Sequence, residues 1–403
     1  MKIIGVKTTI YETDMTRPMG DANSPAGRAR AGGLTVEVTT DEGVTGVAAG
    51  GTSARAMVHS MYDGILSGQD PRRVTGLWQK MVDKAFKGGH DGLVNDAISA
   101  LDVALWDVKA KWNGEPLWKT LGGARPKALG YASGLEMPLT DQQVFDWYSI
   151  MATKYGFKGG KLKVGVDQDS DLRRLGLMHD ALAKVTPYPM LTVDVNEYWS
   201  PKQAIRKVRE MEERHPVFWV EEPARRWDFL GLKRVREGVR AQVCAGENLD
   251  TLGDFLPYFH HGSVDVIQVG TGMTGLTCAL QIADAASGFE LPVTLGGSTG
   301  NWHAEVAPAM PNFMIMEVGD VDAGPVWKSD IRVEDGYLIP GDKPGIGIEI
   351  DHEALERHKV EKLSAVSGPS PFGRRPGAGL WEHPAQDWER ESAAKLTKGL
   401  KFK

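Results

Sequence analysis

The stretch KGGKLKVGV, residues 158–166, reads as a short strand whose two lysines constrain the whole fold. Leu162 is apolar, whereas Lys161 and Lys163 on either side of it project together from the opposite face of a strand. Two like charges inside a globular core would share a low-dielectric environment, which is costly. The stretch therefore predicts a strand with one face in the core and the other facing a functional site.

Other short apolar stretches resemble this strand, and helical stretches separate them. With the lysine strand, the candidate strands cover 129–133, 160–164, 190–195, 217–222, 241–247, 264–269, 291–295 and 313–318. Regular alternation of strands and helices predicts a parallel sheet, and eight such units predict a closed barrel. We therefore expect an α/β fold with a barrel domain over residues 128–328.

Charged residues stand at the ends of these candidate strands, roughly one strand–helix unit apart. They are Lys161, Lys163, Asp194, Glu221, Glu247 and Glu317. The carboxyl ends of barrel strands converge on one face, where the acids would repel one another unless a cation neutralises them. Oxygen ligands without His or Cys favour Mg²⁺. We expect this ion at Asp194, Glu221 and Glu247, with the lysines facing a metal-bound substrate at a lowered pKa.

Each of these charges has an ordinary structural explanation when it is taken alone. A pair of lysines on a strand is usually solvated, and an acid at a strand end usually caps a helix or begins a loop. Their occurrence in order, one set per repeat, favours a catalytic site over these separate explanations.

The first third of the chain has a different pattern, which predicts an α+β domain over residues 1–127. Alternating stretches at 2–11 and 34–40 predict strands, and the apolar stripe of residues 93–111 predicts a helix. Residues 13–33 between the two strands are rich in Pro, Gly and polar side chains, which predicts a long polar loop that acts as a lid. Asp21 and Asn23 belong to this lid, and Arg17 and Arg28 are its candidate substrate contacts.

Two segments follow the barrel. A hairpin-like stretch begins a return segment over residues 329–365, and residues 366–403 form a Pro- and Gly-interrupted, then charged, extension. We expect this extension to pack loosely or against another subunit.

Composition excludes several classes of partner. The 403 residues carry a net charge of −6 without long charged blocks, so nothing favours binding to nucleic acid or to an anionic membrane. No apolar run approaches the roughly 18 residues of a membrane span. Two cysteines and the lack of an export signal at the start of the chain predict a cytoplasmic protein.

The chain resembles the mandelate racemase-type branch of the enolase superfamily, which includes relatives of muconate-lactonising enzymes. The resemblance rests on the helix at 95–123, KLK (161–163), DVNEYW (194–199), VEEP (220–223), AGEN (245–248), GLT (275–277) and PGIGIEID (344–351). It implies a capping domain, a modified (β/α)₇β barrel with the return segment on the cap, Mg²⁺ at the three acids and a homo-oligomer. It also implies abstraction of the proton α to a carboxylate, with the metal stabilising the intermediate.

The sequence departs from that family where a second acid/base is usual. Racemase-type members pair an Asp after the sixth barrel strand with a His after the seventh, but Val269 or Gly270 and Gly297 stand near these positions here. His303 is the nearest imidazole, and it either reaches the site or merely caps and packs. Glu317 resembles the family's acid on the eighth strand, which can donate a hydrogen bond to the substrate.

Two residues close to the metal ligands have open roles. Asn196 lies two residues after Asp194 and so faces the same way, where it can assist the metal or the substrate. Glu222 points the other way along its strand and is expected to be structural.

With one base assigned, dehydration of a polyhydroxylated small-molecule carboxylate is the simplest reaction. Lys163 would act as the base and Lys161 would assist, giving a 2-keto-3-deoxy acid from an aldonate or aldarate. A polar lid suits such substrates, including diacids. The alternatives are a cycloisomerase, epimerase or racemase that uses the same proton step, and a barrel retained only for binding or assembly.

Overall fold

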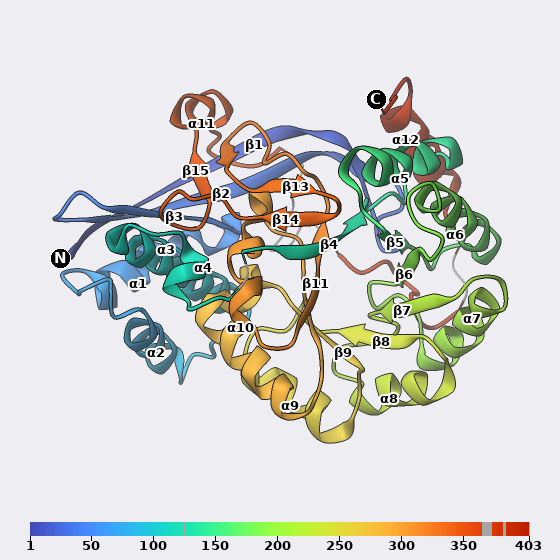
Figure 1. Cartoon of the computed structure of the whole chain (residues 1–403), viewed down its shortest axis with the longest axis horizontal. Helices are drawn as coiled ribbons and strands as arrows, with labels where there is room; N and C mark the ends of the chain where they lie inside the picture. The colour runs from blue at the N-terminus through green and yellow to red at the C-terminus, as the bar shows by residue number, and fades with distance from the viewer. Residues whose placement is uncertain (125, 365–372, 382–383, 403) are drawn as a thin grey trace.

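Two structural units make up the chain, a closed parallel barrel and an N-terminal cap built on an antiparallel sheet (Figure 1). The computed structural model describes residues 1–124, 126–364, 373–381 and 384–402. Both units agree with the fold expected from the sequence. In the part of the chain that is described, no helix is both long and apolar enough to cross a membrane.

The barrel strands follow one another in chain order around the sheet, and the last pairs with the first to close it. They are β4 (Ala128–Ser133), β5 (Gly159–Lys163), β6 (Met190–Asp194), β7 (Val217–Glu221), β8 (Gln242–Ala245), β9 (Val266–Val269), β10 (Val293–Leu295) and β11 (Phe313–Val318). Each expected strand is present, with ends shifted by at most a few residues. A barrel with every strand parallel brings all the carboxyl ends to one face.

Helices cover the outside of the barrel between successive strands. They are α5 (Asp141–Tyr155), α6 (Gln168–Leu182), α7 (Pro201–Arg214), α8 (Phe229–Gly238), α9 (Leu252–His261) and α10 (Thr271–Gly288), with the 3₁₀ turns η3 (Thr299–Glu305) and η4 (Ala307–Ala309) before β11. Local sequence sets their ends. Thr140 with Gln143 forms a capping box at the start of α5, and Gly156 at φ +77° ends it.

The floor of the barrel interior is apolar. Its side chains come from alternate strand positions and are Tyr131, Trp219, Cys244, Val266 and Ile315. Tyr131 and Trp219 pack edge to face with ring centroids 5.2 Å apart. The next inward-facing layer, toward the carboxyl ends, contains the lysines and acids. One side of the charged cluster is therefore covered by apolar side chains.

The cap consists of a three-stranded sheet with helices packed on it. The strands are β1 (Ile3–Met19), β2 (Arg28–Thr40) and β3 (Thr45–Gly50), and the helical segments are η1 (Thr52–Ala54), α1 (Arg55–Met61), η2 (Tyr62–Leu66), α2 (Val74–Ala85), α3 (Leu93–Asn113) and α4 (Leu117–Thr120). Helix α3 corresponds to the helix expected at 93–111. Its apolar face is buried, and Gly114 in the left-handed region ends it.

The long polar loop expected at 13–33 is wrong. β1 and β2 extend through most of that stretch as a ribbon, and only the short turn 20–27 remains irregular. Asp14 lies opposite Arg30 in this ribbon, with Arg30 Nε 3.3 Å from the Asp14 carboxylate. Cross-strand pairs of opposite charge stabilise a solvated ribbon, so polar composition did not mark a loop here.

The return segment leads the chain from the barrel back to the cap. It contains β12 (Trp327–Ser329), β13 (Arg332–Glu334), β14 (Tyr337–Ile339), β15 (Ile348–Ile350) and α11 (His352–His358). β14 pairs antiparallel with β4 at the barrel. Beyond α11, the Val360 amide donates to the Ile10 carbonyl of β1 at 3.0 Å.

The C-terminal extension packs on its own barrel rather than loosely. We call its described residues, 373–381 and 384–402, the C-terminal arm; residues 366–372, 382–383 and 403 lie outside the described part. Arg375 and Glu389 are buried and 2.5 Å apart, and helix α12 (Asp387–Thr397) lies near α5 (Figure 1). The Gln143 side chain of α5 donates to the carbonyls of Thr397 and Leu400. The expectation of loose packing is therefore wrong, because a buried ion pair and hydrogen bonds from Gln143 hold the arm on its own barrel, whereas packing against another subunit stays a prediction.

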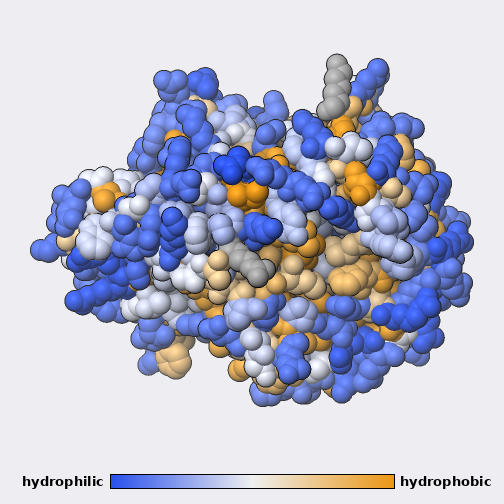
Figure 2. All heavy atoms as spheres, viewed as in Figure 1, coloured by the Kyte–Doolittle hydropathy of each residue, from blue (hydrophilic) through white to orange (hydrophobic). Residues whose placement is uncertain are grey.

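One face of the molecule shows how the polarity is distributed. Hydrophilic residues cover the cap and the outer helices, and hydrophobic residues gather in the middle, over the barrel strands (Figure 2).

Candidate active site

The lysine pair of β5 lies inside the barrel, as its alternation requires. The Lys161 side chain is fully buried and Lys163 is 5 % exposed, whereas Leu162 packs in the hydrophobic core. The backbone holds the pair in place. The Lys163 amide donates to Glu136 Oε1 at 2.5 Å, and the Tyr148 hydroxyl donates to the Lys161 carbonyl at 2.5 Å.

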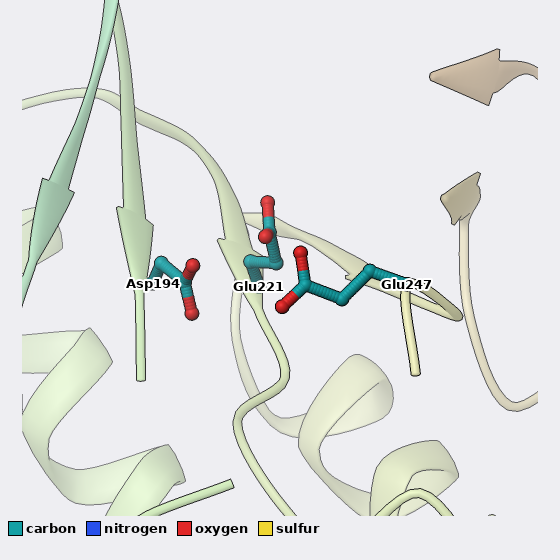
Figure 3. Close-up of side chains that lie close together, drawn as sticks. All are labelled: Asp194, Glu221 and Glu247. Carbon is teal, nitrogen blue, oxygen red and sulfur yellow. The ribbon is translucent and has the colours of Figure 1, made fainter. Parts of the chain in front are cut away.

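Three acids at the ends of the next strands point toward one another (Figure 3). Asp194 ends β6, Glu221 ends β7, and Glu247 follows β8 by two residues. One oxygen of each carboxylate lies within 4.8 Å of one oxygen of the other two. Glu221 Oε2 is buried without a hydrogen-bond partner. Converging carboxylates with an unsatisfied buried oxygen fit a hard divalent cation.

The lysines contact these acids directly. Lys161 Nζ lies 2.5 Å from Glu221 Oε1 and 3.3 Å from carboxylate oxygens of both Asp194 and Glu317. Lys163 Nζ is paired with Asp194 Oδ2. Four acids thus face two ammonium groups, so the ionised cluster has two excess negative charges, the charge that one divalent cation neutralises.

The pKa of each lysine is raised, whereas the sequence led us to expect a lowered value. Burial is the largest single effect and lowers the pKa of both lysines, but the combined attraction of the surrounding acids outweighs it. Glu221 and Glu317 attract Lys161 most strongly, and Asp194 attracts Lys163 most strongly. The expectation counted the repulsion between the ammonium groups and placed a cation beside them. It did not count direct ion pairs with the acids.

The pKa values of the acids are shifted in opposite directions. Burial, with repulsion from Asp194 and Glu247, raises the pKa of Glu221 well above its usual range although Lys161 lies beside it. Burial also raises the pKa of Glu247 to about 6. Burial acts in the same direction on Asp194, but Lys163 and Lys161 outweigh it and hold its pKa below the usual value. Burial also acts to raise the pKa of Glu317, but Lys161 and Lys163 outweigh it. The negative charge is therefore concentrated on Asp194 and Glu317.

A cavity of about 570 Å³ opens onto this cluster. Its inner wall includes Lys163, Glu247 and Glu317, and Glu317 Oε2 accepts from the Gly297 amide at 3.3 Å. Asn196 also lines the cavity, and its backbone amide donates to Asp194 Oδ1 at 2.9 Å. The volume is ordinary for a small-molecule site.

The turn of the cap ribbon supplies part of the cavity wall. Asp21 and Asn23 line the cavity, and Asp21 Oδ1 accepts from the amides of Asn23 and Ser24. The Asn23 side chain donates to the Asn196 carbonyl at 2.8 Å. This asparagine therefore links the cap to the barrel loop that follows Asp194.

The two arginines expected to contact substrate are not among the cavity-lining residues. Arg17 is buried against the Trp147 ring and donates to the carbonyls of Gly134 and Gly319 and to Asp320. It joins the cap ribbon to two barrel loops. Arg28 is partly buried, and Asp21 opposes the lowering of its pKa by burial. Because a β-ribbon replaces the expected loop, Arg17 is fixed in a strand.

His303 has both ring nitrogens engaged. Nδ1 bonds to the Gly296 carbonyl at 2.7 Å, and Nε2 bonds to Thr271 Oγ1. Burial lowers the pKa of His303 to about 4. The ring borders a smaller adjacent cavity of about 130 Å³, which shares Gly297 with the main one. A role for His303 as the second acid/base stays a prediction and would require rearrangement.

Sequence reasoning missed several residues of the outer wall. Glu222 was expected to point away, yet it lines the cavity, because its φ of +43° turns the chain after β7. The other missed residues are Glu136, which holds Lys163, and the lining residues Glu197, Arg225, Arg226, Asn248 and Arg374. Most follow a strand by a few residues, where alternation no longer predicts direction.

Comparisons with known proteins agree with this architecture. A family model described as the mandelate racemase / muconate lactonizing enzyme N-terminal domain matches residues 5–122. A second, described as enolase C-terminal domain-like, matches residues 148–354.

Among curated relatives, the 3,6-anhydro-alpha-L-galactonate cycloisomerase of Streptomyces coelicolor is 30% identical over 344 residues, covering 81% of this chain and 91% of that protein. The L-talarate/galactarate dehydratase of Salmonella typhimurium is 28% identical over 392 residues, covering 93% and 94%.

Solved structures show the same fold. A racemase from Streptomyces coelicolor with bound magnesium superposes with a TM-score of 0.82 at 28% identity, covering 89% of this chain and all of that one. The Salmonella dehydratase liganded with Mg and L-lyxarohydroxamate superposes with a TM-score of 0.80 at 26% identity, covering 89% and 93%.

Proposed function

Because this chain belongs to the mandelate racemase/muconate lactonizing enzyme family of the enolase superfamily, we propose that it is a Mg²⁺-dependent acid-sugar dehydratase. One observation carries the proposal: Lys163 lines a cavity beside three converging acids whose oxygens lie close enough together to hold a divalent cation. Solved relatives of the same fold contain magnesium, and curated relatives include dehydratases of acid sugars.

The three acids Asp194, Glu221 and Glu247 would hold the ion. Mg²⁺ bound there would supply positive charge that stabilises the enolate form of the substrate carboxylate, and it would offset the attraction of Asp194 that raises the pKa of Lys163. Lys161 contributes a second positive charge. It is fully buried and within 3.3 Å of acids on both sides, so it stays an ammonium group beside the developing negative charge.

Lys163 performs the proton transfer. Its neutral amine takes the proton from C2 of the substrate, and the electron pair of that C–H bond moves toward the carboxylate to give the enolate. The same pair then forms the C2=C3 double bond as the C–O bond to the C3 hydroxyl breaks. The leaving hydroxyl takes a proton and departs as water, and the enol product becomes a 2-keto-3-deoxy acid. The Lys163 ammonium group can return its proton to this hydroxyl, and none of the described cavity-lining residues is a histidine.

A cycloisomerase is the second candidate, because one curated cycloisomerase is 30% identical to this chain. It would use the same proton abstraction at Lys163 but open an internal ring without releasing water. The two reactions therefore share the site and differ in the products.

A product screen tests the proposal. We expect the Mg²⁺-loaded protein to convert at least one aldonate or aldarate to a 2-keto-3-deoxy acid, detected by mass as loss of one water. The screen covers pH 6 to 9, and cyclic anhydro acids and lactones of the same sugars are included. Ring opening without water loss would select the cycloisomerase. No conversion of any acid by a folded, metal-loaded protein would overturn both and favour a binding barrel.

A further inference from the structure

Three arginines gather at the outer wall of the cavity, beyond the metal ligands in the chain. Arg225 and Arg226 follow Glu221 in the loop after β7, and Arg374 belongs to the C-terminal arm. We call these three residues the arginine rim. All three line the same cavity as Lys163 and Glu247. The cavity therefore has a cationic outer end in addition to its lysine–acid inner end.

The charges at this outer end do not balance. The central acid is Glu197, whose carboxylate lies 2.5 Å from Arg226 Nε and 3.7 Å from Arg225 Nη1. Among the residues that the structure describes, Arg374 Nη2 donates to the Glu197 backbone carbonyl, at 3.3 Å, and not to a carboxylate. Glu222 is the other acid on this wall, and Asn248 donates to it at 2.8 Å. Three guanidinium groups thus face two carboxylates, and one further negative charge would balance them.

The C-terminal arm holds Arg374 at the cavity by anchoring the residue next to it. Arg375 is buried, and its guanidinium group contacts the Glu389 carboxylate of α12 at 2.5 Å and the Tyr198 hydroxyl at 2.9 Å. Its backbone amide donates to Asn23 Oδ1 at 3.1 Å. The same asparagine lines the cavity from the cap, so cap, barrel and arm meet at one point. The match to the family model ends at residue 354, so Arg374 lies beyond it.

We propose that the substrate is a dicarboxylate of the aldarate type, whose far carboxylate binds the arginine rim, and that Arg374 is a specificity-determining residue. The inference rests on the proposed function, since the near carboxylate is the one activated at the inner end. A planar guanidinium group matches a carboxylate with two parallel hydrogen bonds. A monoacid with a terminal hydroxyl would leave the excess charge of the rim uncompensated.

The test compares diacids with monoacids of the same sugar configuration, such as galactarate with galactonate and glucarate with gluconate. The variants are Arg374→Gln and a matched control, Arg390→Gln, which removes an arginine of the same arm that pairs with Asp387 at the surface. Binding to the Mg²⁺-loaded proteins is measured by calorimetry, and kcat and KM are measured for each acid that is turned over. Equal melting temperatures show that both variants fold.

The wild-type protein is expected to bind and turn over diacids in preference to monoacids. Arg374→Gln should raise the diacid Kd and KM by about tenfold or more, as expected for loss of a charge-assisted hydrogen bond, and should leave the monoacid Kd and KM unchanged. Arg390→Gln should have the same Kd and KM as the wild type for both kinds of acid. Preference for monoacids, or equal effects of the two variants on diacids, would overturn the inference while leaving dehydration intact. If no acid is turned over, the proposed function fails. Binding then tests the arginine rim by itself: tighter binding of diacids that Arg374→Gln weakens supports it, and equal binding of diacids and monoacids contradicts it.

Discussion

Buried carboxylates in helix α3 and at the barrel mouth differ in how fully their oxygens are hydrogen-bonded. Helix α3 of the cap carries Asp102 and Asp107, both fully buried. Asp102 accepts from the Thr277 amide at 2.7 Å and from its hydroxyl at 2.6 Å. At the barrel mouth, by contrast, Glu221 is just as buried, but one of its oxygens has no hydrogen-bond partner.

Asp107 shows the same saturation as Asp102. It accepts from the amides of Val47 at 2.7 Å and Ile346 at 2.9 Å, and from Lys111 Nζ at 2.6 Å. The donors of the two α3 acids belong to the cap sheet, the return segment and helix α10, so these acids join separate parts of the chain. Burial alone therefore does not identify a functional acid. The two α3 acids use their oxygens to join parts of the fold, whereas Glu221 keeps one buried oxygen available to a ligand.

The largest expected effect separates activity from stability. Lys163→Ala removes the proposed base and should lower kcat by about 10³-fold or more, with little change in melting temperature. The control is Lys158→Ala, which removes an exposed lysine just before β5 that pairs with Asp335. Steady-state kinetics and thermal melts on both variants check this. Equal activities of the two variants would show that Lys163 is not the catalytic base.

Replacing an α3 acid is expected to lower stability without lowering activity. Asp107→Ala leaves Lys111 and two backbone amides without their buried acceptor and should lower the free energy of unfolding by about 3 kcal/mol. The kcat per folded molecule should stay the same. Urea unfolding and kinetics on the soluble protein measure the two quantities. A loss of kcat without a loss of stability would contradict the division between the two regions.

Replacing a proposed metal ligand is expected to weaken Mg²⁺ binding without lowering the stability of the metal-free protein. Glu221→Gln keeps the shape of a ligand but removes its charge, and it should weaken Mg²⁺ binding by about 10²-fold. Without metal the same variant should be at least as stable as the wild type, because a buried acid crowded by other acids is replaced. Calorimetry and melts without metal, with Glu237→Gln on the surface of α8 as control, check both parts. Unchanged Mg²⁺ affinity would refute the ligand assignment.

The smallest effect concerns pH. Burial raises the pKa of Asp102 to about 6, despite the bonds from Thr277. The native protein therefore binds a proton here more tightly than the unfolded chain does, and the contribution of this group to stability falls as pH rises from about 4 to about 6. Asp102→Asn should remove about 2 kcal/mol of that fall. Urea unfolding of both proteins at pH 4 and pH 8 measures this difference, and parallel pH profiles would contradict the shift.

Much of the barrel and the inner site was predictable from sequence for a physical reason. Strand alternation fixes the direction of Lys161 and Lys163, and the parallel barrel brings Asp194 and Glu221 to the same end. These residues lie within strands or at their last position. The sheet geometry therefore determines where they point.

The outer site could not be predicted in the same way. Glu222 has a left-handed φ, which reverses the direction expected of its side chain after β7. Arg374 reaches the cavity through the fold of the C-terminal arm, and Arg17 was assigned to a loop that is a strand. The raised pKa values of the lysines depend on which acid each ammonium group contacts. Such contacts between distant segments have no local signal in the sequence.

Hydrogen exchange at the substrate carbon tests the central claim most directly. The Mg²⁺-loaded protein is incubated with an aldarate in D₂O, and proton NMR follows the C2 hydrogen and the C3 position of the product. We expect the wild type to consume the C2 hydrogen and to place one solvent deuterium at C3 of a 2-keto-3-deoxy acid, while Lys163→Ala does neither and still binds Mg²⁺. Loss of the C2 hydrogen at an undiminished rate in Lys163→Ala would contradict it.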